Sequence, residues 1–138
     1  MIHESKIAFT RVDDNGNDKV IKERYLIAEA ESFGDAEEQT YDFCEGETGL
    51  DVIDVKRSKI KEILNTKNNT DDIIWLAELQ DVFVTDDGEE KYTIYKVAFF
   101  AKVFDSAMSY ITEYMKQGYN LELVTLKKTK YKDVIVNG

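Results

Sequence analysis

The sequence predicts an α+β fold, a tandem duplication of a strand–strand–helix–strand unit with a mainly antiparallel sheet and two helices. One pattern of residues occurs twice along the chain, and each occurrence has an Asx-Gly turn signal between two strand-like stretches. Each occurrence also has one helical stretch with an apolar stripe. The chain has 138 residues, of which 43% are hydrophobic, so it can bury a core as one domain.

The internal repeat is clearest in a basic stretch. Residues 55–63 (VKRSKIKEI) align with residues 126–134 (LKKTKYKDV) at an offset of 71 residues (126 minus 55), and each aligned pair is identical or similar in type. The same offset pairs residues of the two helical stretches: Phe33 with Phe104, and Ala36 with Ala107. We therefore expect a single domain, residues 1–138, made of two repeats (about 5–64 and 74–136) that residues 65–73 join.

Each repeat is predicted to begin with a β-hairpin. The turn signals are Asn15-Gly16, between predicted strands 6–12 and 19–30, and Asp87-Gly88, between predicted strands 75–84 and 91–103. Both dipeptides favour tight hairpin turns because their residues tolerate positive φ. The run VAFFA at 97–101 is apolar on both faces, which is typical of a central strand.

A helix is predicted after each hairpin. Ser32 is expected to cap the first helix, with Asp35 three residues further on as in a capping box, and Asp105 is expected to cap the second. The predicted apolar stripes are Ala36, Thr40, Phe43 and Cys44 in the first helix, and Ala107, Met108, Ile111, Tyr114 and Met115 in the second. Each repeat is then predicted to close with one long strand, residues 50–63 and 121–136.

The composition favours a cytoplasmic protein. No apolar run approaches the ~20 residues that a membrane-spanning helix needs, and the first residues do not resemble a signal peptide. The single cysteine, Cys44, cannot form an internal disulfide, which fits a reducing compartment. We expect no membrane partner.

The net charge of −10 is concentrated in one part of the chain. Residues 25–55 contain ten Asp and Glu side chains and no Lys or Arg, whereas the remaining 18 acids (28 minus 10) are balanced by all 18 bases. Glu37, Glu38 and Asp42 belong to this acidic segment and are expected on the outer face of the first helix. Because the excess charge is local, it does not exclude an anionic partner for the rest of the chain.

The sequence carries no motif for catalysis, for a metal or for a cofactor. His3, the only histidine, is expected at a frayed terminus, which argues against histidine-based acid–base chemistry. An EF-hand loop that begins at Asp13 would need Gly and Glu where Asp18 and Arg24 stand, so this loop is predicted to be a hairpin turn. We expect a non-enzymatic protein without cofactors.

Eight of the 18 basic residues lie in two short windows of the closing strands: Lys56, Arg57, Lys59, Lys61, Lys127, Lys128, Lys130 and Lys132. We expect each closing strand to extend beyond the core and to carry its cationic end into solvent. Such a paired basic surface would neutralise phosphates, and Tyr131 and Trp75 are candidate rings for base stacking. This pattern favours a protein that binds single-stranded nucleic acid.

Other interpretations stay open. Lysines on exposed strand ends also deter edge-to-edge aggregation without binding anything. The acidic segment 29–54, with Glu37, Glu38 and Asp42, is compatible with a protein-interaction module, an inhibitor or a DNA mimic, whose partner would be a host or phage protein. A small-molecule ligand and a homo-oligomer are also compatible with the sequence.

The order of hairpin, helix and basic closing strand, given twice, resembles a family of domains of unknown function from Bacteroidota and their phages. The resemblance is carried by residues 56–60 (KRSKI) and 127–131 (KKTKY), and by residues 33–36 at the start of the first helix. It covers nearly the whole chain and implies a small accessory protein of a phage or mobile element. It implies no activity and no site residues.

Overall fold

The structure, a computed structural model, describes residues 1–118 and 120–136. The chain forms two compact units. The first unit consists of residues 1–59 together with those from 130 onward, and the second consists of residues 60–129. These units differ from the two sequence repeats, because the last strand of each repeat belongs to the unit of the other repeat. That the chain behaves as one domain stays a prediction.

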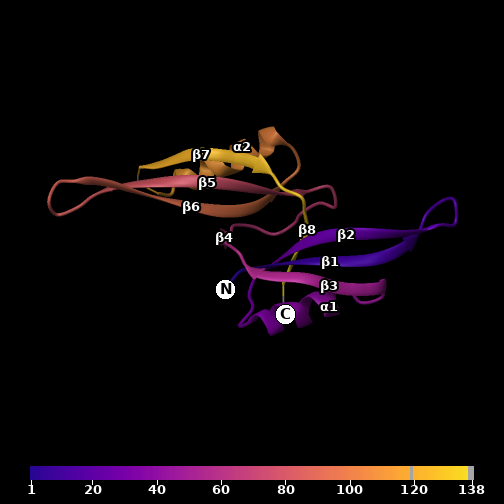
Figure 1. The fold of residues 1–138 in the computed structure, drawn as a ribbon. Coiled ribbons are helices and arrows are strands. Elements are labelled where there is room, and N and C mark those ends of the chain that lie inside the picture. The colour runs from indigo at the N-terminus through magenta and orange to yellow at the C-terminus, as the bar shows by residue number, and fades with distance from the viewer. Residues whose placement is uncertain (119, 137–138) are drawn as a thin grey trace. The chain divides into compact units, whose positions relative to one another are not determined.

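The first unit contains β1 (His3–Val12), β2 (Asp18–Ile27), α1 (Phe33–Phe43), β3 (Thr48–Arg57) and β8 (Tyr131–Ile135). Its sheet has the order β3-β1-β2-β8, with β1 antiparallel to β2 and to β3, and β8 parallel to β2. Helix α1 covers one face of this sheet (Figure 1), over a core that includes Ile7, Phe9, Tyr25, Ile27 and Ala36.

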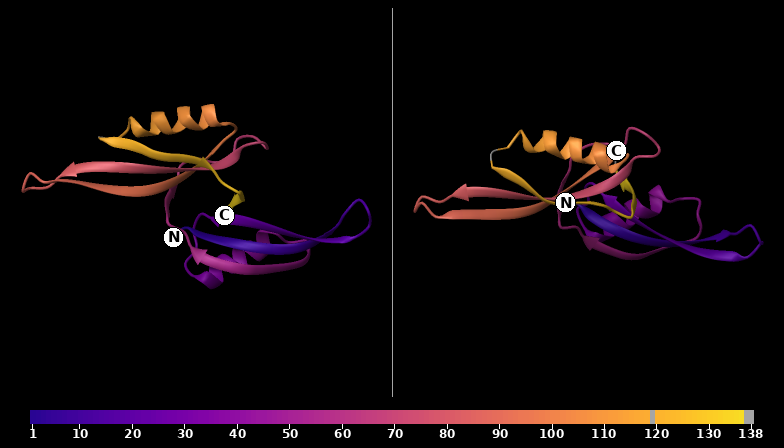
Figure 2. Two further views of the ribbon diagram at one scale, coloured as in Figure 1. Left: turned by 45° about the horizontal axis from the view of Figure 1, so that its top comes forward. Right: turned by 90° about the horizontal axis from the view of Figure 1, so that it is seen from above.

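The second unit has the same plan. It contains β4 (Ile60–Ile63), β5 (Ile73–Val84), β6 (Glu90–Ala101), α2 (Phe104–Met115) and β7 (Leu121–Lys128). The sheet order is β4-β6-β5-β7, and β4 is the strand that runs parallel to its neighbour, β6. Helix α2 lies along one face of this sheet (Figure 2), over a core that includes Trp75, Leu79, Val97, Phe99 and Ile111.

The two units match in detail, which confirms the α+β class and the repeated order of hairpin, helix and strand. Both hairpin turns contain a glycine in the left-handed region, Gly16 with φ of 79° and Gly88 with φ of 80°. At the start of α1, Phe33 makes an edge-to-face contact with His3, at 5.7 Å between ring centroids. The equivalent Phe104 of α2 makes the same kind of contact with Trp75, at 6.0 Å.

The prediction of one long closing strand in each repeat is wrong. Strand β3 ends at Arg57, opposite His3 of β1, and β4 then pairs with β6 in the other sheet. Strand β7 ends in the same way before β8 pairs with β2. The expected projection of these strands into solvent is therefore wrong as well. The physical reason is that β4 and β8 carry apolar side chains that are buried, Ile60 and Ile135, and their backbone groups pair with a sheet edge.

The first predicted helix cap is confirmed and the second is wrong. Ser32 Oγ accepts a hydrogen bond from the backbone N–H of Asp35 at 3.0 Å. In α2 the cap residue is Val103, and Ser106 Oγ bonds the backbone N–H and the carbonyl of Val103 at 3.1 and 2.8 Å. Asp105 lies in the first turn and does not cap the helix. Within the described part of the chain, neither helix has the length and hydropathy that crossing a bilayer requires.

Two predictions about single side chains are also wrong. His3 is not frayed, because it lies in β1 and only 2% of its surface is exposed. Phe43 does not belong to the buried stripe of α1, because it lies at the end of the helix and is 49% exposed. Cys44 is buried in the core of the first unit, as its position on the stripe predicts.

Candidate nucleic-acid interface

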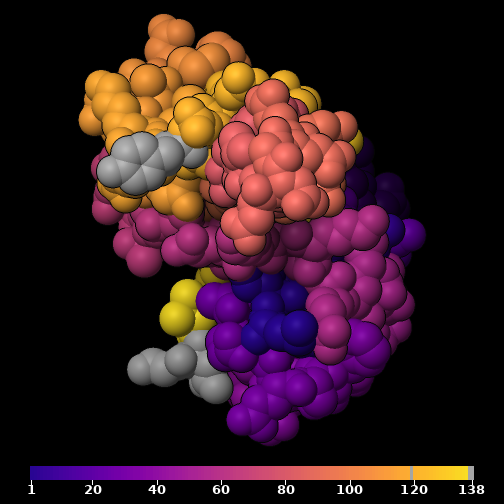
Figure 3. All heavy atoms as spheres, turned by 90° about the vertical axis from the view of Figure 1, so that its left-hand side faces the viewer, coloured from indigo at the N-terminus to yellow at the C-terminus, as the bar shows by residue number. Residues whose placement is uncertain are grey.

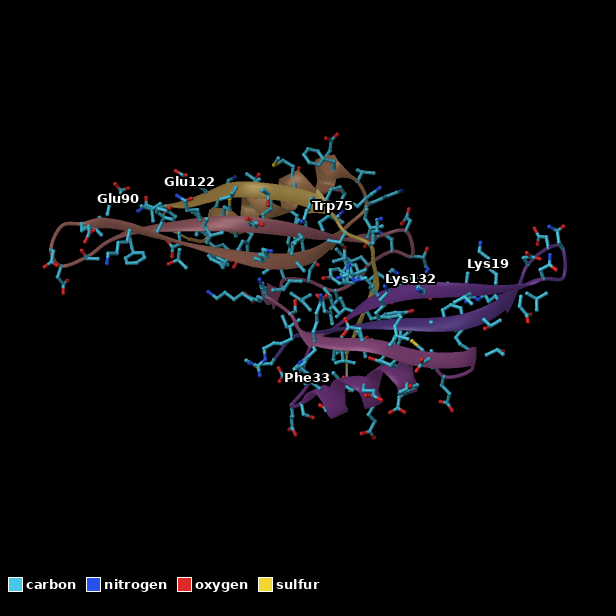
Figure 4. All side chains as sticks on the ribbon, viewed as in Figure 1. Lys19, Phe33, Trp75, Glu90, Glu122 and Lys132 are labelled. Carbon is cyan, nitrogen blue, oxygen red and sulfur yellow. The ribbon has the colours of Figure 1, made fainter. Side chains whose placement is uncertain are left out.

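All eight predicted basic residues are exposed, and they lie on edge strands or directly beside them. In the first unit they are Lys56 and Arg57 of β3, Lys59, Lys130, and Lys132 of β8 (Figure 4); in the second they are Lys61 of β4, and Lys127 and Lys128 of β7. The chain passes between the units at residues 59–60 and 129–130. The two basic stretches are therefore the two segments in which the chain crosses from one unit to the other.

Three of these cations have partners within their own unit. Lys56 Nζ lies 3.3 Å from Glu4 Oε1, and Lys132 Nζ lies 3.7 Å from Glu23 Oε2. Lys61 Nζ lies 4.5 Å from the centre of the Tyr95 ring. The other five form no ion pair with any residue that the structure describes: Arg57, Lys59, Lys127, Lys128 and Lys130. No described acid of the chain neutralises these five exposed charges, so they can pair with an external anion.

The cations of one unit do not form a single cluster. In the first unit, β3 and β8 lie at opposite edges of the sheet with β1 and β2 between them. Three strand spacings of ~4.8 Å put these edges roughly 14 Å apart. The second unit has the same separation between β4 and β7. Each unit thus offers cations at both edges of its sheet, an arrangement that suits an extended polyanion better than one small anion.

A polar network joins three strands of the first unit around Glu4, whose residue surface is only 8% exposed. Glu4 accepts hydrogen bonds from the hydroxyl of Tyr131 at 2.7 Å and from Nη2 of Arg24 at 2.8 Å, and Lys56 adds an ion pair. Burial alone would raise the pKa of Glu4, but the bonds from Tyr131, Arg24 and Lys56 outweigh it and hold the pKa below its usual value. Glu4 is therefore a charged, fully partnered group.

Tyr131 has a structural task that the sequence did not predict. The Arg24 guanidinium carbon lies 4.8 Å from the centre of the Tyr131 ring, so one partner covers the ring while Glu4 holds its hydroxyl. Burial and the hydrogen bond to Glu4 raise the pKa of Tyr131 well above its usual value. No local signal could have revealed this network, because Glu4 and Tyr131 are 127 positions apart in the chain. Base stacking on Tyr131 stays a prediction.

Trp75 is not available for base stacking. Only 5% of its surface is exposed, and its indole N–H donates a hydrogen bond to the carbonyl of Ala101 at 3.0 Å. It is a core residue of the second unit, beside α2. The exposed aromatic rings of this unit include Tyr92 and Phe83 of the β5–β6 hairpin, whose tip stands in the foreground of Figure 3 in salmon.

A hollow of about 240 Å³ lies beside the Glu4 network in the first unit. It is lined by three cations and two acids among its six residues: Glu4, Ser5, Lys6, Arg24, Asp54 and Lys56. Because Glu4 pairs with two of these cations and the lining carries a net formal charge of only +1 (three cations minus two acids), the hollow has little charge to offer a small anion. Among the residues described, no three His, Cys, Asp or Glu side chains are grouped so that they could hold a metal ion.

The acidic face of α1 has the exposure that the sequence predicts. Glu37, Glu38 and Asp42 are all exposed on this helix, and none of them forms an ion pair with a described residue. Asp35 has a structural role instead, because its carboxylate accepts a hydrogen bond from the backbone N–H of Glu31 at 3.0 Å. The outer face of α1 therefore carries unneutralised negative charge.

Comparison with protein-family models gives one match, to a domain of unknown function (DUF4494), over residues 1–137. The chain belongs to the DUF4494 family. The match spans residues of both units and both crossing segments of this chain. Neither the curated proteins nor the solved structures contain a match to this chain. Membership in DUF4494 carries no activity, so function must be argued from the surfaces described above.

Proposed function

We propose that this chain is a non-enzymatic accessory protein that binds single-stranded nucleic acid through its two basic crossing segments. One observation carries the proposal: exposed cations lie at both sheet edges of both units, and six of the eight have no ion pair within the described structure. Exposed Lys and Arg that neutralise phosphates release condensed counterions, which supplies sequence-independent affinity. A role in a phage or mobile element is part of the same proposal.

The arrangement of the cations suits a single strand. Cations at both edges of each sheet can follow a backbone that crosses the sheet, and a flexible single strand adapts to such spacing more easily than a stiff duplex. Phosphate contacts carry no base information, so binding should depend little on sequence. Tyr131 is close to Lys130 and Lys132 along the chain, but its hydroxyl and ring already have partners in the first unit.

The competing interpretation gives these lysines only a protective role. All four strands concerned, β3, β4, β7 and β8, are sheet edges, and charged edge residues discourage pairing with other molecules. The two interpretations differ in what removal of the charges does. Loss of phosphate contacts weakens binding, whereas loss of protection promotes aggregation without any effect on nucleic-acid affinity.

Fluorescence anisotropy with a labelled single-stranded oligonucleotide at low salt tests the proposal. We expect binding at micromolar protein, weaker binding to a duplex of the same sequence, and equal competition by unlabelled single strands of different sequences. Light scattering on a Lys59→Gln, Lys61→Gln, Lys130→Gln and Lys132→Gln variant measures aggregation in parallel. If the native protein does not bind at micromolar concentration and the variant aggregates, these residues only protect the sheet edges from pairing with other molecules.

A second candidate function rests on the acidic face of α1. Glu37, Glu38 and Asp42 are exposed and have no ion pair with a described residue, which is an arrangement that a cationic protein partner could neutralise. In this alternative the chain is a protein-interaction module, an inhibitor or a DNA mimic that binds a host or phage protein. The two candidate functions use different surfaces, so substitutions in one should leave the other unchanged.

A further inference from the structure

The last strand of each repeat cannot reach the far edge of the sheet that its own repeat forms. In the first unit, the edge position beside β2 lies three strand spacings from β3, or about 14 Å. Only residues 58 and 59 connect β3 to β4, and three Cα–Cα steps of about 3.8 Å reach at most about 11 Å. The same limit applies to residues 129 and 130 between β7 and β8. Within one chain, β4 therefore cannot take the edge beside β2, and β8 cannot take the edge beside β6.

Backbone pairing alone does not decide which sheet accepts which strand. The edge beside β2 accepts β8 with Arg24 opposite Tyr131, and the edge beside β6 accepts β4 with Lys96 opposite Ile60. These two edges are equivalent, and so are the two strands. The edge beside β2 could therefore accept β8 of its own chain or β4 of a second copy. The first choice closes a single chain, and the second links copies together.

The side chains near these edges differ between the units in a matched way. In the strand registers, Glu4 and Leu76 occupy equivalent positions, because Glu4 lies opposite Lys56 and Leu76 lies opposite Lys127. The neighbouring cation is kept in both units, as Arg24 in one and Lys96 in the other. At the positions of Glu4 and Tyr131, the second unit has a leucine and an isoleucine instead. Glu4 and Tyr131 are therefore neighbours in the first unit, and Leu76 and Ile60 occupy the equivalent positions in the second unit.

We propose that the hydrogen bond between Glu4 and Tyr131 selects β8, and rejects β4, as the strand that completes the sheet of the first unit. If β4 took this place, Ile60 would lie beside Arg24 and the buried Glu4 would lose the donor that now lies 2.7 Å away. If β8 took the place of β4, Tyr131 would meet Leu76, which cannot accept a hydrogen bond. An exchange of β4 and β8 would create both mismatches. The arrangement in which β8 pairs with β2 and β4 pairs with β6 is therefore favoured, and both strands come from the same chain.

Exchanging the matched residues tests this inference. The first variant combines Ile60→Tyr with Tyr131→Ile, so that the tyrosine now lies on β4. The second variant adds Glu4→Leu and Leu76→Glu, which moves the acid to the other sheet and restores the match. We expect the first variant to form dimers or larger assemblies of about twice the native mass or more in light scattering, and the second to return to the mass of the native chain.

Thiol cross-linking identifies the strand beside β2 directly. Lys132 and Glu23 face each other, with 3.7 Å between Nζ and Oε2. In a Cys44→Ser background, Glu23→Cys with Lys132→Cys should be joined within one chain by a short bifunctional reagent. Glu23→Cys with Lys61→Cys should give no cross-link between copies in the native sequence. In the first variant the cross-link between positions 23 and 132 of one chain should be lost, and a cross-link should form between position 23 of one copy and position 61 of another.

Each outcome decides the question. A first variant that keeps the native cross-link and the native mass would overturn the inference, because β8 would then be selected without the Glu4–Tyr131 bond. A first variant that does not fold, together with a second variant that folds with the native cross-link, supports it. Two variants that are equally unfolded would overturn it, since restoring the match would have restored nothing.

Discussion

At the scale of single residues, the least expected feature is a buried carboxylate that holds two distant parts of the chain together. Glu4 of β1 accepts bonds from Tyr131 of β8 and from Arg24 of β2, and all three lie in the first unit. Hydrogen bonds to a charged group contribute more to stability than bonds between neutral groups. This network therefore contributes to the attachment of β8 to its sheet.

Removing the hydroxyl of Tyr131 should destabilise the protein. Tyr131→Phe keeps the ring but leaves Glu4 without its 2.7 Å donor, so we expect the free energy of unfolding to fall by about 1.5–3 kcal/mol. Urea denaturation measures the change. Tyr92→Phe is the matched control, because Tyr92 is 65% exposed, and its stability should stay within about 0.5 kcal/mol of the native protein. Equal stability of both variants would contradict the assigned role of Tyr131.

The contribution of Glu4 should depend on pH. Its pKa in the folded protein lies below the usual 4.5, so the unfolded chain takes up a proton first as the pH falls. The stabilisation is fully present above pH 4.5 and is lost as the pH falls through the folded pKa. Glu4→Gln should therefore be clearly less stable than the native protein at pH 7, and the difference should shrink in acid. Thermal unfolding of the variant and the native protein at pH 7 and in acid measures this difference, with exposed Glu122→Gln as the control. A difference in stability that stays constant with pH would refute the prediction.

At the scale of elements, the sequence predicts what is local. Asn15-Gly16 and Asp87-Gly88 mark both hairpins because turn chemistry is encoded in adjacent residues, and Ser32 marks the start of α1 for the same reason. The sequence does not identify the cap of α2, because Asp and Ser are both residue types that cap helix starts. The structure shows that Ser106, rather than Asp105, makes the capping bonds. Phe43 was misplaced because helical spacing does not show where a sheet stops covering the helix.

The break in each closing strand could not be predicted in the same way. Residues 50–63 and 121–136 read as continuous strands, because alternation persists through the break. What interrupts them is the end of the partner strand, β1 or β5, and the presence of a free edge in another sheet. Strand partners are non-local, so a periodic pattern indicates that a strand exists without indicating its sheet.

The acidic outer face of α1 can be tested by charge reversal. Reversing Glu37, Glu38 and Asp42 to Lys should abolish capture of a cationic protein partner if α1 is the contact surface, because the charge complementarity is inverted. Thermal stability should change little, since all three side chains are exposed. A pull-down compares this variant with a control that reverses three exposed acids of the second hairpin loop: Asp86, Asp87 and Glu89. An equal effect of both reversals would argue against a specific surface.

At the scale of the whole molecule, the duplication determines where the charges lie. Because each repeat donates its last strand, the basic stretches become the two crossing segments, and equivalent cations appear in both units. The sequence predicts these eight cations and their exposure, but it does not predict that Lys56 and Lys132 have acidic partners. Those partners, Glu4 and Glu23, are distant in the chain, and only the fold brings them close.

The salt dependence of single-stranded DNA binding tests the central claim most directly. If about four cations neutralise phosphates, log K should fall with log salt at a slope near −3, since each contact contributes roughly −0.7. Replacing Lys59, Lys61, Lys130 and Lys132 by Gln should weaken binding and flatten this slope. A control with the same loss of charge at exposed lysines elsewhere should keep it: Lys19, Lys22, Lys67 and Lys91. An equal slope in both variants, measured by fluorescence anisotropy, would contradict binding through the crossing segments.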